Sequence, residues 1–156
     1  MKKTEIGKKI INFKAESTNK DEFNLKDHKG NYVVIFFYPK DNTPGCTQEG
    51  LDFSNNLVKF NKLNTKIYGV SRDSIKSHDN FKNKYKYKFD LISDPDEYLC
   101  NLFDVIKEKS MFGKKYMGIE RSTFIIDPKG TLIKEWRKVK VNGHSDEVLQ
   151  YIKNLN

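Results

Sequence analysis

The chain has 156 residues, of which 37% are hydrophobic and 13% aromatic; this composition excludes a disordered chain and predicts one domain over residues 1–156. The formal net charge of +8 admits an anionic partner such as nucleic acid or a membrane surface, although the lysines are spread along the whole sequence. No stretch approaches the roughly 20 apolar residues of a membrane span. No signal peptide is recognisable, so we expect a cytoplasmic protein without a membrane partner.

The first third of the chain predicts strands. Residues 12–15 and 22–25 alternate between apolar and polar side chains, as half-buried strands do. Residues 32–38 are an unbroken apolar and aromatic run, which is typical of a central strand covered on both faces. Pro39 ends this strand because proline has no N–H to donate to a neighbouring strand.

A crossover unit is expected next. Apolar residues recur with roughly helical spacing from about residue 46 to 63, and residues 66–71 predict a second core strand. Ser74 is the expected N-cap of a helix that runs to about residue 85, and a short strand follows over 89–92. If these strands are parallel, the connection between them is a right-handed crossover.

The last third predicts a short helix, a pair of strands and a final helix. A proline suits the first turn of a helix over 95–103, strands are expected at 122–126 and 131–136, and Ser145 is the expected cap of the last helix. Residues 113–115 are interpreted as part of a basic loop. The predicted fold class is α/β with thioredoxin-like element order: a central mixed β-sheet of about five core strands with helices on both faces.

Cys46 is the candidate nucleophile. It follows the end of a predicted core strand and stands at the first turn of a predicted helix, where free N–H groups favour an anion. The Thr43 hydroxyl, three residues upstream, can point into the same concavity. The alternative is a buried and inert cysteine, which is common in protein cores.

A helix end alone does not stabilise a thiolate sufficiently. Lowering a thiol pKa from about 8.5 to about 6 takes roughly 3.4 kcal/mol. A helix terminus supplies about 0.3–1 kcal/mol, and up to ~2 in sheltered geometry, so a nearby guanidinium is required. The arginines are Arg72, Arg121 and Arg137. The first two lie at predicted sheet edges and spacing does not choose between them, whereas Arg137 is expected at the surface.

Two segments of the sequence resemble one family of redox enzymes. The pattern Pro39-x-x-x-Thr43-x-x-Cys46 resembles the peroxiredoxin active-site motif. The longer run over residues 37–49, and a second run over 109–130, are similar to the bacterioferritin comigratory protein (peroxiredoxin Q) subfamily. The likeness covers nearly the whole chain.

The resemblance implies a thioredoxin-dependent thiol peroxidase that reduces hydrogen peroxide and organic hydroperoxides. Cys46 would be the peroxidatic cysteine and form a sulfenic acid, and Thr43 would hydrogen-bond the peroxide and the thiolate. Pro39 would shield the thiolate from water and over-reaction, and Arg121 becomes the preferred guanidinium. No cofactor or metal is implied. Thioredoxin, glutaredoxin or a small thiol is the expected reductant, and the oligomeric state is expected to be a monomer or weak homodimer.

The sequence departs from the subfamily at the resolving thiol. Many members carry a resolving cysteine five positions after the peroxidatic one, where this chain has Leu51. Cys100 is the other thiol, and it is interpreted either as a possible resolving residue or as a buried helix cysteine. A disulfide between Cys46 and Cys100 would require their Cα atoms to lie within roughly 7 Å of each other. We expect that the chain would have to unfold locally to bring them that close. We therefore expect a one-cysteine cycle that an external thiol completes.

Two other functions compete with peroxide reduction. A thiol-disulfide oxidoreductase or redox-regulated holdase would suit the same fold, but the Cys-x-x-Cys pair is missing. Lysines alternating with tyrosines over residues 82–88 could bind a nucleic-acid strand. The favoured interpretation of this segment is instead a helix C-terminus followed by a solvated loop, so no nucleic-acid partner is expected.

His28, His78 and His144 lack metal-ligand spacing and are expected at the surface.

Overall fold

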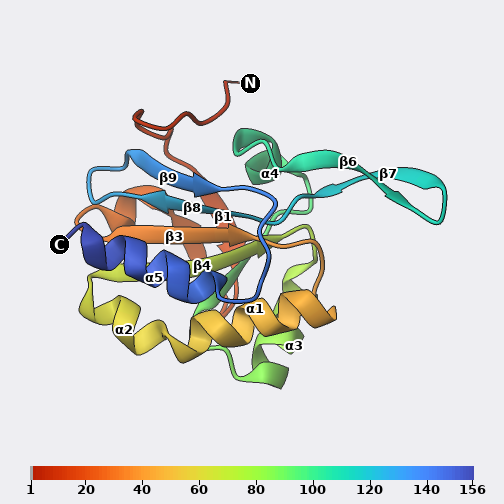
Figure 1. Cartoon of the computed structure of the whole chain (residues 1–156), viewed down its shortest axis with the longest axis horizontal. Helices are drawn as coiled ribbons and strands as arrows, with labels where there is room; N and C mark the ends of the chain where they lie inside the picture. The colour runs from red at the N-terminus through yellow and green to blue at the C-terminus, as the bar shows by residue number, and fades with distance from the viewer. Residues whose placement is uncertain (1) are drawn as a thin grey trace.

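The computed structural model describes residues 2–156. Seven strands form one mixed sheet in the order β2-β1-β5-β4-β3-β8-β9, in which β3, β4 and β5 are parallel and the other pairs are antiparallel (Figure 1). The strands are β1 (Lys14–Ser17), β2 (Glu22–Asn24), β3 (Tyr32–Phe37), β4 (Thr65–Ser71), β5 (Asp90–Ser93), β8 (Ser122–Ile126) and β9 (Leu132–Trp136). The predicted α/β class with a central mixed sheet is confirmed, and the sheet is wider than the five or so strands expected.

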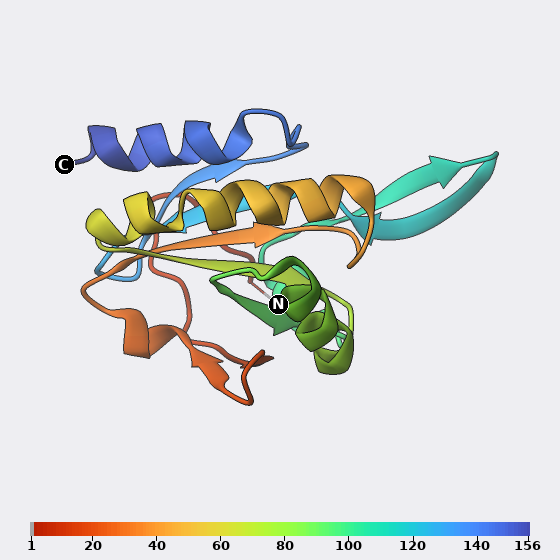
Figure 2. The ribbon, with the colours of Figure 1, turned by 90° about the horizontal axis from the view of Figure 1, so that it is seen from below.

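Helices cover both faces of this sheet. They are the 3-10 helix η1 (Leu25–His28) and the α-helices α1 (Pro44–Asn55), α2 (Leu57–Lys62), α3 (Ile75–Tyr85), α4 (Tyr98–Leu102) and α5 (His144–Asn154). Buried residues of α1, α2, α3 and α5 share one core cluster, whereas those of α4 and η1 belong to a second. Figure 2 shows α1 and α5 side by side over the same face of the sheet.

The central strand β3 separates the two cores. Val33, Ile35 and Phe37 point into the cluster that contains α4. Val34 and Phe36 point into the cluster under α1 and α3. Successive side chains of a strand face opposite sides of a sheet, so a strand that is apolar at every position is buried on both faces. The interpretation of residues 32–38 as a doubly covered strand is confirmed.

Helix boundaries differ from the predicted ones at two places. The predicted helix over 46–63 begins earlier, at Pro44, and is divided at Asn56. Asparagine is a weak helix former, and the Asn56 amide donates instead to the Ser145 hydroxyl at 2.9 Å. Ser145 was expected to cap α5, but that helix begins at His144 after the left-handed Gly143 (φ +77).

The short helix α4 is capped by an acid from outside it. Glu97 adopts a left-handed conformation (φ +62), so the helix begins at Tyr98 and not at the proline of position 95. The Asp94 carboxylate accepts hydrogen bonds from the backbone N–H groups of Leu99 (3.1 Å) and Cys100 (2.8 Å). It thereby satisfies donors that a helix start leaves free. By contrast, Ser74 caps α3 as predicted.

A second, two-stranded sheet replaces the expected basic loop. Strands β6 (Ile106–Met111) and β7 (Lys114–Ile119) pair with each other in a hairpin that extends away from the body (Figures 1 and 2). The prediction of a loop was wrong because only the base of the hairpin, at Ile106 and Ile119, reaches the core, so burial imposes no alternating pattern along the rest of the strands. Within residues 2–156, none of the helices combines the length and apolar character needed to cross a membrane.

Candidate active site

Cys46 lies in the first turn of α1, directly after the loop that leaves β3. Thr43 is the N-cap residue in an extended conformation, and the proline that follows it occupies the first helical position, where no N–H is needed. Thr43 accepts a backbone hydrogen bond from Thr47 (2.9 Å), which closes the first turn. The Cys46 side chain is 2% exposed and belongs to the core cluster under α1. Solvent therefore reaches very little of this residue.

Sheet register brings Arg121 to this cysteine. β8 pairs antiparallel with β3, with Ser122 opposite Phe37, so the residue before Ser122 lies where the chain departs toward α1. Arg121 Nη2 lies 3.4 Å from Cys46 Sγ. This contact joins positions 75 residues apart in the sequence, and only the strand pairing creates it.

Glu49 follows Cys46 by one turn of α1 and binds the same arginine, so Cys46, Arg121 and Glu49 form a row of three side chains. Its Oε1 accepts a hydrogen bond from Arg121 Nη1 at 2.6 Å, and its side chain is 1% exposed. Its Oε2 is buried without a hydrogen-bond partner among residues 2–156. The guanidinium thus contacts the Glu49 carboxylate through Nη1 and the Cys46 sulfur through Nη2.

Burial dominates the electrostatics of this row. Desolvation raises the pKa of Glu49 to about 7, against the opposing pull of Arg121. Burial also disfavours the charge on Arg121, but Glu49 and Cys46 outweigh it and raise the pKa of Arg121, which stays a cation. Burial and the nearby guanidinium lower the pKa of Lys109, at the base of the hairpin. The sulfur therefore lies beside the cationic Arg121 guanidinium, with Lys109 close enough to interact electrostatically with both.

Thr43 and Pro39 lie in the loop that joins β3 to α1. Both are half-buried. The Thr43 hydroxyl donates to the Lys40 carbonyl at 2.8 Å, and it makes no side-chain hydrogen bond to the start of the helix. Its single hydrogen is used in this way, so the expected hydrogen bond from Thr43 to the Cys46 thiolate is not made. The Thr43 oxygen keeps lone pairs for a donor from outside.

The other two arginines are engaged elsewhere. Arg72 donates to Glu97 Oε2 at 3.0 Å, beside the end of β4. Arg137, expected at the surface, is half-buried and donates to the backbone carbonyls of Phe103 (2.9 Å) and Asp104 (2.7 Å), so that expectation was wrong. The geometric choice between Arg72 and Arg121, which spacing left open, falls on Arg121.

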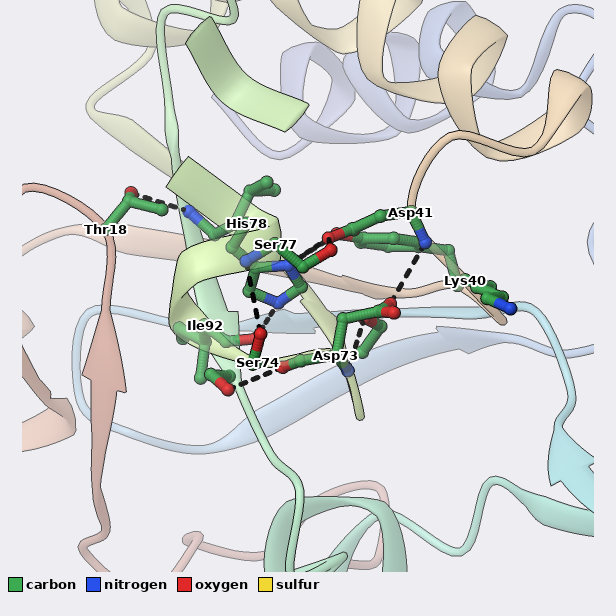
Figure 3. A network of polar contacts seen from close by, with 12 residues as sticks. Thr18, Lys40, Asp41, Asp73, Ser74, Ser77, His78 and Ile92 are labelled. Atoms are coloured by element: carbon green, nitrogen blue, oxygen red, sulfur yellow. Dashed lines mark hydrogen bonds and ion pairs between the residues drawn. The ribbon is translucent and has the colours of Figure 1, made fainter. Parts of the chain in front are cut away.

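A buried polar network anchors the loop that carries the cysteine (Figure 3). The Asp41 carboxylate accepts hydrogen bonds from Tyr38 Oη (2.6 Å) and Ser77 Oγ (2.7 Å), and its Oδ2 lies 2.8 Å from His78 Nδ1. His78 Nε2 lies 2.9 Å from the Ile92 carbonyl oxygen. The loop before α1 is thereby fastened to α3 and β5 at once.

The expected surface position of the histidines was wrong. His78 is fully buried and His144 is 4% exposed, with its Nε2 2.7 Å from the Thr123 hydroxyl; His28 is half-buried. Histidine is apolar enough for a core when both ring nitrogens find partners. The partners of His78 come from segments 14 and 37 residues away, so no local pattern announces them.

Asp41, Asp73 and His78 each present one possible metal ligand, and these atoms lie within 4.8 Å of one another. Asp73 Oδ2 accepts the backbone N–H of Asp41 (3.0 Å) and the Ser71 hydroxyl, and the remaining atoms are bonded within the network of Figure 3. Each candidate ligand already has a protein donor or acceptor, so we describe this cluster as a hydrogen-bond network.

The Lys/Tyr segment of residues 82–88 is partly core. Tyr87 is 4% exposed, and its hydroxyl donates to the Thr47 carbonyl at 2.9 Å, one residue after the cysteine. A Cβ at Gly50 would lie 2.4 Å from Tyr87 Cζ, so the glycine makes room for the ring. Lys82 pairs with Asp90 at 2.6 Å. Tyr87 is therefore a support for α1 and not a free stacking platform.

Cys100 and Cys46 belong to different cores. Cys100 is fully buried in the cluster on the α4 side of the sheet, whereas Cys46 lies in the cluster on the α1 side. Burial first, and then the Asp94 carboxylate, raise the pKa of the Cys100 thiol well above its usual range. The interpretation of Cys100 as a buried helix cysteine is confirmed. Leu51, at the position of the missing resolving thiol, packs against the cluster on the α1 side.

Comparison with known proteins decides the family. The AhpC/TSA family matches residues 6–135. A curated relative from Xanthomonas campestris, named Peroxiredoxin Bcp, is 60% identical over 129 residues, which are 83% of this chain and 81% of the relative. This chain belongs to the peroxiredoxin family. The bacterioferritin comigratory protein subfamily expected from the sequence is confirmed, and the chain is a thiol peroxidase.

Solved peroxiredoxins have the same fold. The crystal structure of a cysteine-to-serine mutant of Xylella fastidiosa PrxQ matches with a TM-score of 0.93 and 44% identity over 99% of this chain and 98% of that one. A structure of the Xanthomonas campestris bacterioferritin comigratory protein, described for its alkyl peroxide reduction activity, matches with a TM-score of 0.87 and 54% identity over 91% and 90% of the two chains. The thioredoxin-like peroxiredoxin fold predicted from element order is confirmed.

Some residues of the site were not given a role by the sequence reasoning. Glu49 and the Asp41–His78 pair are the main ones. A signal for Glu49 exists: it stands three residues after the cysteine and four before Phe53, on the helix face that is otherwise apolar. A lone carboxylate on such a face needs a cation, which predicts an arginine beside it. No comparable signal exists for His78.

Proposed function

We propose that Cys46 is the peroxidatic cysteine of a peroxidase acting on hydrogen peroxide and organic hydroperoxides. The Cys46 thiolate attacks one peroxide oxygen, a sulfur–oxygen bond forms, and the oxygen–oxygen bond breaks. Sulfur gives up two electrons and becomes a sulfenic acid, while the leaving oxygen takes a proton and departs as water or an alcohol. Organic hydroperoxides are included because the related Xanthomonas campestris protein is described by its alkyl peroxide reduction.

Three neighbours are assigned roles in this step. Arg121 stabilises the thiolate and the charge that develops on the leaving oxygen, since a fixed donor in a sheltered site costs no reorganisation during the reaction. The Thr43 oxygen, whose hydrogen is bonded to the Lys40 carbonyl, accepts the peroxide O–H. Pro39, half-buried in the loop between β3 and α1, limits water around the sulfur.

An external thiol completes the cycle. A first thiol condenses with the sulfenic acid, releasing water and leaving a mixed disulfide; a second thiol then attacks that disulfide and frees Cys46. Thioredoxin, glutaredoxin or a small thiol fits this step, and a reducing compartment such as the cytoplasm supplies them. Cys100 is a poor internal alternative because it lies in the other core.

The observation that supports this proposal best is the 3.4 Å contact between Arg121 Nη2 and Cys46 Sγ. The test is intact-mass analysis after one equivalent of peroxide, with and without a sulfenic-acid trap. We expect one trapped adduct per chain, located on Cys46, and no adduct or peroxide consumption in Cys46→Ser. Full activity of Cys46→Ser would contradict the proposal. A loss of two hydrogens with a linked Cys46–Cys100 peptide would contradict the one-cysteine cycle.

A further inference from the structure

The β6–β7 hairpin carries apolar side chains into solvent. The two strands pair only with each other, and the hairpin projects beyond the rest of the fold (Figures 1 and 2). The hairpin exposes four large apolar or aromatic residues: Phe112 (97% exposed) and Met111 (56%) at its tip, and Tyr116 (42%) and Met117 (55%) farther along β7. Single exposed apolar residues are ordinary, but four on one projecting hairpin indicate an interaction site.

Phe112 occupies a backbone position that disfavours it. It forms a two-residue turn with Gly113, and both have positive φ (+52 and +77). This geometry belongs to a type I′ hairpin turn, in which Asn-Gly is the preferred pair. A bulky residue at positive φ is strained, and its ring gains nothing here from packing within the chain. Both costs point to a use for the ring outside the folded chain.

The register distributes these residues around the tip. Met111 pairs with Lys114, and Tyr116 pairs with Lys109, so both apolar side chains of these pairs share one face of the hairpin. Met117 pairs with Glu108 on the opposite face. Phe112 stands at the apex. A groove on a protein partner would cover one face, whereas the interface of a lipid bilayer surrounds an inserted tip on all sides, which favours lipid.

Charge identifies the kind of lipid. Residues 106–119 contain four lysines, at positions 107, 109, 114 and 115, against the single acid Glu108. Lys107 pairs with Asp104 at 3.3 Å, so the excess of positive charge lies at the other three, toward the tip. Glu108 lies 3.6 Å from Lys115, and both are exposed. Lysines beside an apolar tip extend their ammonium groups to phosphates while their stems cover apolar surface. The combination of an apolar tip with basic flanks matches an anionic bilayer surface.

We propose that the β6–β7 hairpin docks on anionic lipid bilayers. Phe112 and the methionines insert at the level of the headgroups, and the lysines bind lipid phosphates. β7 leads through Glu120 to Arg121, which contacts the Cys46 sulfur, so docking brings Cys46 close to the bilayer. No membrane partner was expected because no stretch of the sequence is long and apolar enough to span a bilayer, but docking by a hairpin tip needs no such stretch. The inference concerns binding alone and does not depend on the peroxidase chemistry.

The test is co-sedimentation of the full chain with vesicles. One set contains phosphatidylglycerol and phosphatidylcholine, and the other contains phosphatidylcholine alone. Phe112→Asn is the informative variant, because asparagine suits the turn and the hairpin is expected to fold at least as well. Ile11→Asn, at a position 65% exposed in the N-terminal segment, is the matched control. We expect binding to the anionic vesicles only, weakened roughly tenfold by Phe112→Asn and unchanged by Ile11→Asn.

A second pair of variants separates the hairpin from the general positive charge. Lys114→Gln with Lys115→Gln is expected to weaken binding several-fold, whereas Lys59→Gln with Lys62→Gln, which removes equal charge from α2, is expected to leave it unchanged. Peroxide consumption without vesicles should be the same in all variants, which shows that each is folded.

Three outcomes would overturn the docking proposal. One is that the unmodified chain does not sediment with anionic vesicles. Another is that the two lysine pairs weaken binding equally and Phe112→Asn has no effect, which would indicate adsorption through net charge. The third is that the chain ignores vesicles but binds an acidic polypeptide such as polyglutamate in a Phe112-dependent manner, which would identify a protein partner.

Discussion

The Glu49 carboxylate and the Arg121 guanidinium form a buried ion pair, with Oε1 and Nη1 separated by 2.6 Å. The same guanidinium reaches the Cys46 sulfur with its other terminal nitrogen. An arginine can make both contacts in one plane because its donors form a rigid fork, whereas a lysine offers a single point of charge. Glu49 therefore fixes the orientation in which Arg121 meets the sulfur.

Glu49→Gln should remove a pH dependence of stability. The pKa of Glu49 is raised to about 7 in the folded protein from an ordinary 4.5, so ionisation is disfavoured by folding. Glu49 therefore contributes to the free energy of unfolding in full below about pH 4.5, and this contribution is lost as the pH rises through about 7. The change is on the order of 3 kcal/mol. Urea unfolding at pH 5 and pH 8 measures it. From pH 5 to pH 8, the free energy of unfolding of the variant should rise relative to that of the parent. The same difference between variant and parent at both pH values would contradict the prediction.

Arg121→Lys should retain charge but lose the fork. We expect peroxide reduction to slow by roughly 100-fold, the usual effect of removing one positioned donor at a reacting centre. Stopped-flow measurement of peroxide consumption is the test. Arg72→Lys is the matched control, because Arg72 pairs with Glu97 away from the sulfur, and its rate should change little. Equal rates for both variants would remove Arg121 from the proposed mechanism.

Local patterns were sufficient for the elements that have a buried face. Residues 32–38 were predicted as a strand because a strand covered on both faces is apolar throughout. Ser74 was predicted as a cap because a serine before a helix can accept a free backbone N–H. The β6–β7 hairpin was missed for the converse reason. Only its base, at Ile106 and Ile119, packs on the core, so the rest of the two strands carry no pattern imposed by burial.

The site was predictable only as far as local sequence and resemblance reach. Cys46 could be placed at a helix start from neighbouring residues. Its contact with Arg121 depends on the antiparallel pairing of β3 with β8, and spacing alone did not select Arg121 over Arg72. His78 was assigned to the surface because the acid and the carbonyl that satisfy its ring come from distant segments.

His78→Ala should loosen the loop before the cysteine. The Asp41 carboxylate loses its contact with the ring, and a buried acid short of a donor costs on the order of 3 kcal/mol. Urea unfolding measures this loss, and hydrogen exchange at residues 40–46 reports the loop directly. His28→Ala is the control, since His28 is half-buried and contacts Tyr68 on the opposite side of the sheet. A smaller loss in His78→Ala than in His28→Ala would contradict an anchoring role.

The double variant Asp41→Asn with His78→Ala separates the pair from its surroundings. If the two residues stabilise each other, the double variant should be less destabilised than the sum of the single ones, by about 1 kcal/mol or more. Additive losses would mean that Tyr38 and Ser77, which also donate to Asp41, carry the network without the histidine.

Cys100→Ala should leave catalysis intact. The Cys100 thiol is fully buried, its pKa is raised by burial and by Asp94, and it lies across the sheet from Cys46, so it gives neither a ready nucleophile nor a short path to a disulfide. Removing the sulfur from a packed site should lower the free energy of unfolding by about 1 kcal/mol. Peroxide turnover should be measured with dithiothreitol and with thioredoxin as separate reductants, using Cys46→Ser as the inactive reference. Equal rates for Cys100→Ala and the parent with both reductants are expected. A rate that falls with thioredoxin alone would mean that Cys100 passes electrons to Cys46, and the sheet between them would then have to open during each cycle.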